Sequence, residues 1–119
     1  MSDVADGEFE AVWNQLELET RDREIFGGGY DQPFRKLLEA SRATSLRQFF
    51  PFTSMCRLCF ARSEYPFRDL QPAFVEFFPG DRYIVRSGTP YSVDRDPPVE
   101  LETGEPMVAI ANIIRLLGI

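Results

Sequence analysis

The fold of this chain is decided by residues 73–86, which read AFVEFFPGDRYIVR. Residues 73–78 are rich in phenylalanine and typical of a β-strand. Pro79, Gly80 and Asp81 form a turn sequence, and residues 82–86 read as the returning partner strand. The stretch therefore predicts a β-hairpin and, with it, an antiparallel sheet.

Two flanking segments extend this sheet. Residues 55–62 alternate between two sets of side chains, which predicts one continuous strand starting at Met55. Residues 99–102 predict a short edge strand, in which Glu100 and Glu102 would discourage pairing with another sheet. The sequence thus predicts an antiparallel sheet of three to four strands.

Helical patterns precede the sheet. Apolar residues at positions 9, 12, 13 and 16 share one face of a helix predicted over residues 8–19, with Asp6 as its N-cap. Residues 16–20 also alternate like a strand, so the end of this helix stays open. The glycines at 27–29 are interpreted as a flexible connector, after which Asp31 is expected to cap a helix over residues 33–43. Residues 45–50 predict one further turn that Pro51 ends.

A third helix is predicted at the C-terminus. Thr103 is expected to cap it, Pro106 lies in its first turn, an apolar stripe runs to Leu117, and Gly118 ends it. These elements predict an α+β fold of two layers, an antiparallel sheet covered by two N-terminal helices and one C-terminal helix. Because the sequence shows no repeat and no boundary, residues 1–119 are expected to form a single domain.

Charge is distributed unevenly along the chain. Residues 1–24 hold eight acidic residues against two arginines, which accounts for the whole net charge of −6. Residues 35–62 hold six cationic residues against Glu39 alone. Two interpretations stay open: an acidic element that pairs with a neighbouring basic one, or a basic face that meets an anionic partner and is screened by the acidic end.

The composition excludes several functional classes. The chain has no histidine and only two cysteines, which excludes a histidine-based triad, a zinc finger and a disulfide scaffold. The acidic balance argues against nucleic acid as a partner. Neither a signal sequence nor an apolar stretch long enough for a bilayer is evident, so we expect a cytoplasmic protein without membrane contact.

Two short motifs are interpreted as structural. Cys56 and Cys59 match a C-x-x-C pattern, but on a strand their α-carbons would lie roughly 10 Å apart, beyond the reach of a disulfide. Asp94-Arg95-Asp96 stands beside two prolines without a phosphate-binding loop, as in a solvated loop. No catalytic residue, metal site or cofactor is therefore predicted.

The most distinctive stretch runs from Arg62 to Arg68 and places Tyr65-Pro66-Phe67 between two arginines. Aromatic residues and arginine are enriched in binding hot spots. Together with a neighbouring arginine, the stretch predicts a recognition surface made of Arg57, Arg62, Tyr65, Phe67 and Arg68. The alternative is that Tyr65 and Phe67 fold back onto the core.

Residues 46–117 resemble a known family. This part of the chain is similar to small actinobacterial domains of unknown function. The matching stretches are Leu46 through Phe50-Pro51-Phe52-Thr53-Ser54, then Phe60-Ala61-Arg62-Ser63, Tyr65-Pro66-Phe67, Arg82-Tyr83 and a closing helix over 106–117. Members of that family are labelled as natural-product biosynthesis proteins. They often carry a histidine after the serine matched by Ser54, where this chain has Met55.

The resulting expectation is a non-enzymatic binding or regulatory module that acts through protein–protein contacts, accessory to natural-product biosynthesis. One alternative is a small accessory enzyme or small-molecule carrier, which needs a pocket with converging polar groups. Another is an immunity or antitoxin protein that uses residues 8–24 against a basic toxin. The many aromatic residues also leave a homo-oligomer open.

Overall fold

A computed structural model of the chain describes residues 2–63, 69–90 and 97–119. Three α-helices lie within these ranges, α1 (Ser2–Asp22), α2 (Asp31–Arg42) and α3 (Pro106–Leu117), with a 3-10 helix η1 (Ser45–Gln48) after α2. The described strands are β1 (Phe50–Ser54), β2 (Arg57–Ala61), β3 (Ala73–Phe78), β4 (Arg82–Ser87) and β5 (Val99–Thr103). They form one antiparallel sheet in the order β1-β2-β3-β4-β5.

The α+β class and the hairpin at residues 73–86 are confirmed, but the strand count was too low, since the described residues form five strands. Residues 55–62 are not one strand: Ser54 pairs with Arg57 across a turn at Met55 and Cys56. Pro51 does not end the preceding turn either. It lies in the edge strand β1, where a missing N–H is tolerated.

All three predicted helices exist, with different starts. Helix α1 begins at Ser2, so Asp6 lies inside it and does not cap it. Helix α2 begins at Asp31, and the Asp31 carboxylate accepts bonds from the preceding N–H groups of residues 25–27. Helix α3 begins at Pro106. Its N-cap residue, Glu105, makes no capping bond with its side chain, and the Thr103 Oγ1 accepts a bond from the Glu105 N–H. Gly118 ends α3 in the left-handed conformation, as predicted (φ 71°).

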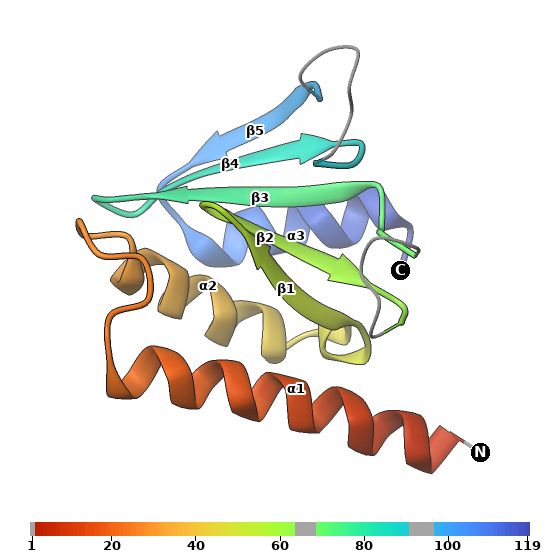
Figure 1. The fold of residues 1–119 in the computed structure, drawn as a ribbon. Helices are drawn as coiled ribbons and strands as arrows, with labels where there is room; N and C mark the ends of the chain where they lie inside the picture. Colours follow the sequence, from red (N-terminus) through yellow and green to blue (C-terminus); the bar gives the residue numbers. More distant parts are fainter. Residues whose placement is uncertain (1, 64–68, 91–96) are drawn as a thin grey trace.

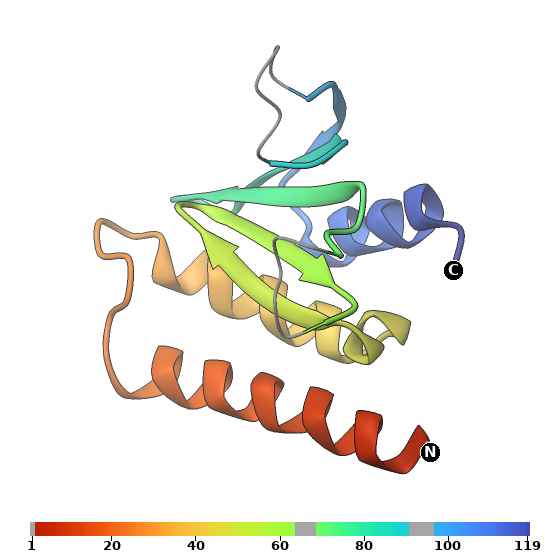
Figure 2. The same cartoon turned by 45° about the vertical axis from the view of Figure 1, so that its right-hand side comes forward.

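The helices lie on one side of the sheet (Figure 1). Helices α2 and α3 pack against it, while α1 runs antiparallel to α2 and contacts the edge strand β1 (Figures 1 and 2). The largest side chains that this packing buries completely are Trp13, Tyr83, Phe34, Phe60, Phe77, Leu37, Leu38, Leu46, Leu58, Ile110 and Ile113.

Trp13 joins α1 to the end of η1. Its indole N–H donates to the carbonyl oxygens of Arg47 and Phe49, both at 3.1 Å. The Tyr83 hydroxyl similarly donates to the Pro33 carbonyl at 2.9 Å, which ties β4 to the start of α2. Both of these buried polar groups thus have partners, and their bonds tie α1 to the end of η1 and β4 to the start of α2.

Candidate functional site

Arg57, the first residue of the predicted recognition surface, lies on the outer face of the sheet, opposite the helices. Its strand neighbour Leu58 is in the core, so the Arg57 side chain projects the other way. The Arg57 Nε lies 3.6 Å from the Glu76 carboxylate, and the guanidinium covers the Phe74 ring at 5.8 Å. Its Nη1 donates to the Pro90 carbonyl at 3.5 Å.

A second arginine shares the same carboxylate. The Arg86 Nε lies 2.7 Å from Glu76, and the Arg86 Nη1 donates to the Pro97 carbonyl at 2.7 Å. Glu76 is only 12% exposed between the two guanidiniums. The cluster therefore fastens both Pro90 and Pro97 to the sheet, and Arg57 has a structural role in it.

Arg62 lies just beyond the opposite end of β2. Five residues of a strand span roughly 16 Å, so Arg57 and Arg62 do not form one patch. Arg62 is exposed, and its guanidinium covers the ring of Phe49 at 5.2 Å. Tyr65, Phe67 and Arg68 lie outside the described residues.

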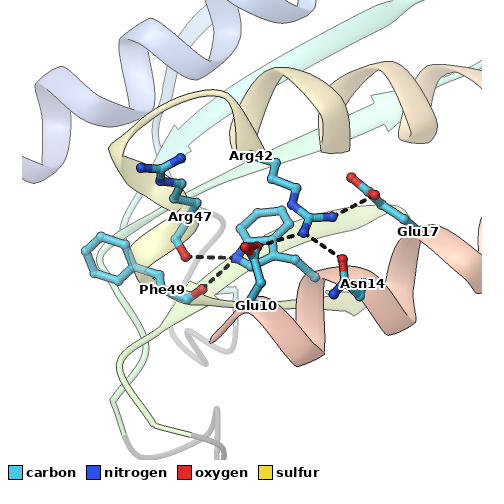
Figure 3. Close-up of polar contacts among 7 residues, drawn as sticks. Glu10, Asn14, Glu17, Arg42, Arg47 and Phe49 are labelled. Carbon is cyan, nitrogen blue, oxygen red and sulfur yellow. Dashed lines mark hydrogen bonds and ion pairs between the residues drawn. The ribbon is translucent and has the colours of Figure 1, made fainter. Parts of the chain in front are cut away.

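The structure gathers polar side chains where α1 meets α2 (Figure 3). The Arg42 guanidinium contacts the Glu10 carboxylate at 2.7 Å, the Glu17 carboxylate at 2.7 Å and the Asn14 side-chain oxygen at 2.6 Å. Burial alone lowers the pKa of Arg42, but the two carboxylates outweigh it and raise this pKa above its usual range. The acidic segment thus pairs with the basic one through these two glutamates, as the first of the two interpretations expected.

A shallow hollow of about 260 Å³ lies beside this cluster, between α1 and η1. Arg47 and Gln48 are exposed at its rim, and no described residue pairs with the Arg47 guanidinium. Arg42 pairs with Glu10, while Arg47 adds an exposed positive charge at the rim of the hollow. We call the hollow and the adjacent arginine the η1 corner, which comprises Phe9, Glu10, Arg47, Gln48 and Arg62.

Sequence reasoning missed Arg47 and Gln48 as surface residues. The basic composition of residues 35–62 was visible, but which arginines stay outside was not. Arg42 and Arg47 differ by five positions, yet one contacts three α1 side chains and the other contacts none of the described ones. The difference arises because α1 packs beside Arg42 and supplies its partners, while Arg47 stays exposed.

A second hollow of about 180 Å³ lies between the C-terminal half of α1 and α2. Pockets for small molecules usually enclose about 300–1,000 Å³. Both of these hollows are smaller than that. The second is lined by Glu17, Thr20, Arg21, Arg35, Leu38 and Glu39.

The buried thiol of Cys59 is not activated. Both cysteines are unbonded, and Cys59 is 1% exposed in β2, on the outer face of the sheet. Burial raises the pKa of the Cys59 thiol to about 12, and the nearby Arg57 charge offsets only part of this. Among residues 2–63, 69–90 and 97–119, no three histidine, cysteine or acidic side chains lie close enough to hold a metal ion.

These features define an α+β protein with two exposed arginines, Arg47 and Arg62, beside the end of a 3-10 helix. The chain belongs to a family of unknown function (DUF6193), whose family model matches residues 9–117. No curated protein and no solved structure gives a significant match. No helix in the described part of the chain is both long and apolar enough to traverse a bilayer.

Proposed function

We propose that this protein is a non-enzymatic binding module that holds an acidic segment of a partner protein at the η1 corner. The observation that carries the proposal is the contrast between Arg42 and Arg47. Arg42 is neutralised by two glutamates, whereas Arg47 presents its charge at the rim of a hollow.

The η1 corner has the chemistry that an acidic peptide needs. A guanidinium binds carboxylates through two parallel N–H donors, and Arg47 and Arg62 both supply one at an exposed position. The Gln48 amide adds donors and an acceptor, while Phe9 gives the hollow an apolar wall. Such a site favours an extended acidic segment with an apolar side chain between its carboxylates.

The sequence segment that contains Tyr65, Phe67 and Arg68 belongs to the same proposal. These residues follow Arg62 directly in the chain, and aromatic residues beside arginine are enriched in binding hot spots. We propose that they extend the surface that begins at Arg62. Arg57 contributes to it only indirectly, since its guanidinium is committed to Glu76 and Pro90.

The proposed setting is a regulatory or accessory role in natural-product biosynthesis in actinobacteria, supported by the resemblance carried by residues 46–117. The carrier alternative has less support because both hollows are small and shallow. An immunity-type function remains a second candidate. Glu8, Asp22 and Glu24 are exposed, and no described residue forms an ion pair with them.

The proposal is tested with a fluorescein-labelled array of Asp/Glu-rich peptides, read by fluorescence anisotropy. Arg47→Glu places a carboxylate in the hollow, and we expect it to weaken peptide binding by about tenfold or more. Arg23→Glu, an equal charge change at an exposed position on the connector after α1, is the matched control and should change binding by less than about threefold. Added salt should weaken the wild-type binding.

Two results would contradict the proposal. Equal loss in Arg47→Glu and Arg23→Glu would mean that only net charge attracts the peptide. Absence of binding to every acidic peptide, together with salt-sensitive binding to lysine-rich ones, would favour the immunity-type function. The thermal midpoint of both variants is measured in parallel, and we expect it to stay near the wild-type value because both side chains are exposed.

A further inference from the structure

The outer face of α3 is apolar and uncovered. Arg115 is the only charged residue of this helix, and its Ala109, Ile110 and Ile113 are buried against α2 and the sheet. On the opposite side, Met107 is 58% exposed and Val108 46% exposed. Ala111 is exposed between them and Arg115, and Ile119 follows the end of the helix at 45% exposure.

Such a face differs from that of an ordinary surface helix. A helix that covers one face of a sheet usually carries charged and polar residues on its outer side. Here apolar side chains occupy both sides, and Met107, Val108 and Ala111 are left outside the inner contact. Exposed apolar residues that gather on one helix mark a site of association.

The ends of α3 indicate what this face contacts. Glu105 precedes the helix and Arg115 lies in its last turn, ten positions further on. This separation is about 15 Å along the axis, too far for the two to pair within one chain. Neither forms an ion pair with a described residue, since the pairs found there join other side chains.

Two antiparallel copies of α3 bring these charges together. A two-fold axis midway between them passes near Ala111, and each Arg115 then lies opposite the partner subunit's Glu105. The small Ala111 side chain at the crossing point lets the helices approach to the usual 8–10 Å. The same arrangement places the two helix dipoles antiparallel.

We propose that α3 forms the contact of a two-fold symmetric homodimer, in which Ala111 packs against its counterpart, Met107 and Val108 pack against the C-terminal half of the partner's α3, and Arg115 pairs with the partner subunit's Glu105. The dimer does not use the η1 corner, so it is independent of the proposed function. It would display two η1 corners in one particle and strengthen binding to a partner with repeated acidic segments.

The contact is small, and the dimer is accordingly concentration-dependent. A stable dimer usually buries about 800 Å² on each subunit, more than one face of a 12-residue helix supplies. We therefore expect a monomer–dimer equilibrium with a dissociation constant on the order of tens to hundreds of micromolar.

Sedimentation velocity over a concentration series tests the proposal. Val108→Glu should abolish self-association, whereas Leu18→Glu, at an equally exposed apolar position on α1 (46%), should leave it unchanged. Glu105→Arg and Arg115→Glu each place like charges opposite one another and should weaken the dimer about tenfold. The double variant exchanges the two charges and should restore the dimer to within about threefold of the wild type.

Three outcomes overturn the proposal. One is a wild-type chain that stays monomeric up to millimolar concentration. Another is a dimer that Val108→Glu leaves intact or that Leu18→Glu weakens equally. The third is a double variant that stays as weak as the single variants, which excludes the antiparallel pairing. Circular dichroism of each variant separates loss of the dimer from loss of the fold.

Discussion

Asp31 shows how one carboxylate organises the connection between α1 and α2. It is 5% exposed and accepts bonds from the backbone N–H groups of Ile25, Phe26 and Gly27 at 2.6 Å, 3.2 Å and 2.8 Å. Burial alone raises the pKa of this carboxyl, but the three N–H donors and the Arg35 charge outweigh burial and lower the pKa below its ordinary value of 3.8. The folded state therefore stabilises the charged form of the Asp31 carboxyl more than the unfolded state does.

This lowered pKa gives a pH prediction. A carboxyl with a lowered folded-state pKa adds stability above its unfolded-state value, 3.8, and this stability is lost as the pH falls through the folded-state pKa. Asp31→Asn cannot ionise and should reduce the unfolding free energy at neutral pH by about 1–3 kcal/mol. Urea unfolding at a series of pH values measures this. The difference between wild type and variant should shrink below about pH 4, and a constant difference would contradict the assignment.

Met55 has a strained backbone conformation at the turn between β1 and β2. Its φ is 57° and its side chain is 79% exposed, so a left-handed backbone carries a side chain that contacts little. Two-residue hairpin turns of this kind favour glycine at the first central position.

We therefore expect Met55→Gly to stabilise the protein by about 0.5–1 kcal/mol. Met55→Val, with a β-branched side chain at the same φ, is the matched opposite and should destabilise it. Thermal unfolding measures both. A lower midpoint for Met55→Gly than for Met55→Val would show that the exposed side chain matters more than the backbone.

At the scale of elements, α1 depends on few contacts. It packs against α2, β1 and η1 and lies outside the layer formed by α2 and α3 (Figure 2). Its polar attachments among the described residues include Trp13, the Arg42 cluster and the bond that Arg35 donates to the Thr20 carbonyl at 3.1 Å. An element held in this way opens more readily than the central strands.

Arg42→Met tests this attachment, because it keeps the apolar stem and removes the charge. The side chains of Arg42 and Glu17 are 23% and 28% exposed, so we expect a loss of about 1–2 kcal/mol. Native-state hydrogen exchange should show faster exchange of the α1 amides, by about tenfold. The amides of β3 and β4 should be affected less. Arg82→Met is the control: the Arg82–Glu102 pair is more than half exposed and its loss should be close to neutral.

At the scale of the molecule, the charge separation of the sequence is partly offset where α1 meets α2. Glu10 and Glu17 contact Arg42, and the other acidic residues of α1 are Asp3, Asp6, Glu8, Glu19 and Asp22. Among the cationic side chains that stay exposed without an ion pair to a described residue, Arg47 and Arg62 lie at the η1 corner, and others, including Arg21, Arg23 and Arg115, lie elsewhere. The two proposed contacts, the η1 corner and the outer face of α3, involve different elements and can be occupied together.

Much of the fold follows from the sequence alone. The hairpin at residues 73–86, the strand β5 and the end of α3 at Gly118 were predictable because a turn sequence, an alternating pattern and a helix-ending glycine act over a few residues. Strand β1 was not. Pro51 and the absence of a turn residue at Met55 gave the wrong signal, and the strand exists because it pairs with β2 at the edge of the sheet.

The candidate site was less predictable than the fold. The sequence shows that Arg57 and Arg62 are cationic and that aromatic residues follow them. Only the register of β2, β3 and β4 places Glu76 between Arg57 and Arg86, and only the docking of α1 pairs Arg42 while leaving Arg47 exposed. Local signals therefore determined the elements, whereas the tertiary structure decided which charges stay available, because ion pairing depends on distances between residues far apart in the chain.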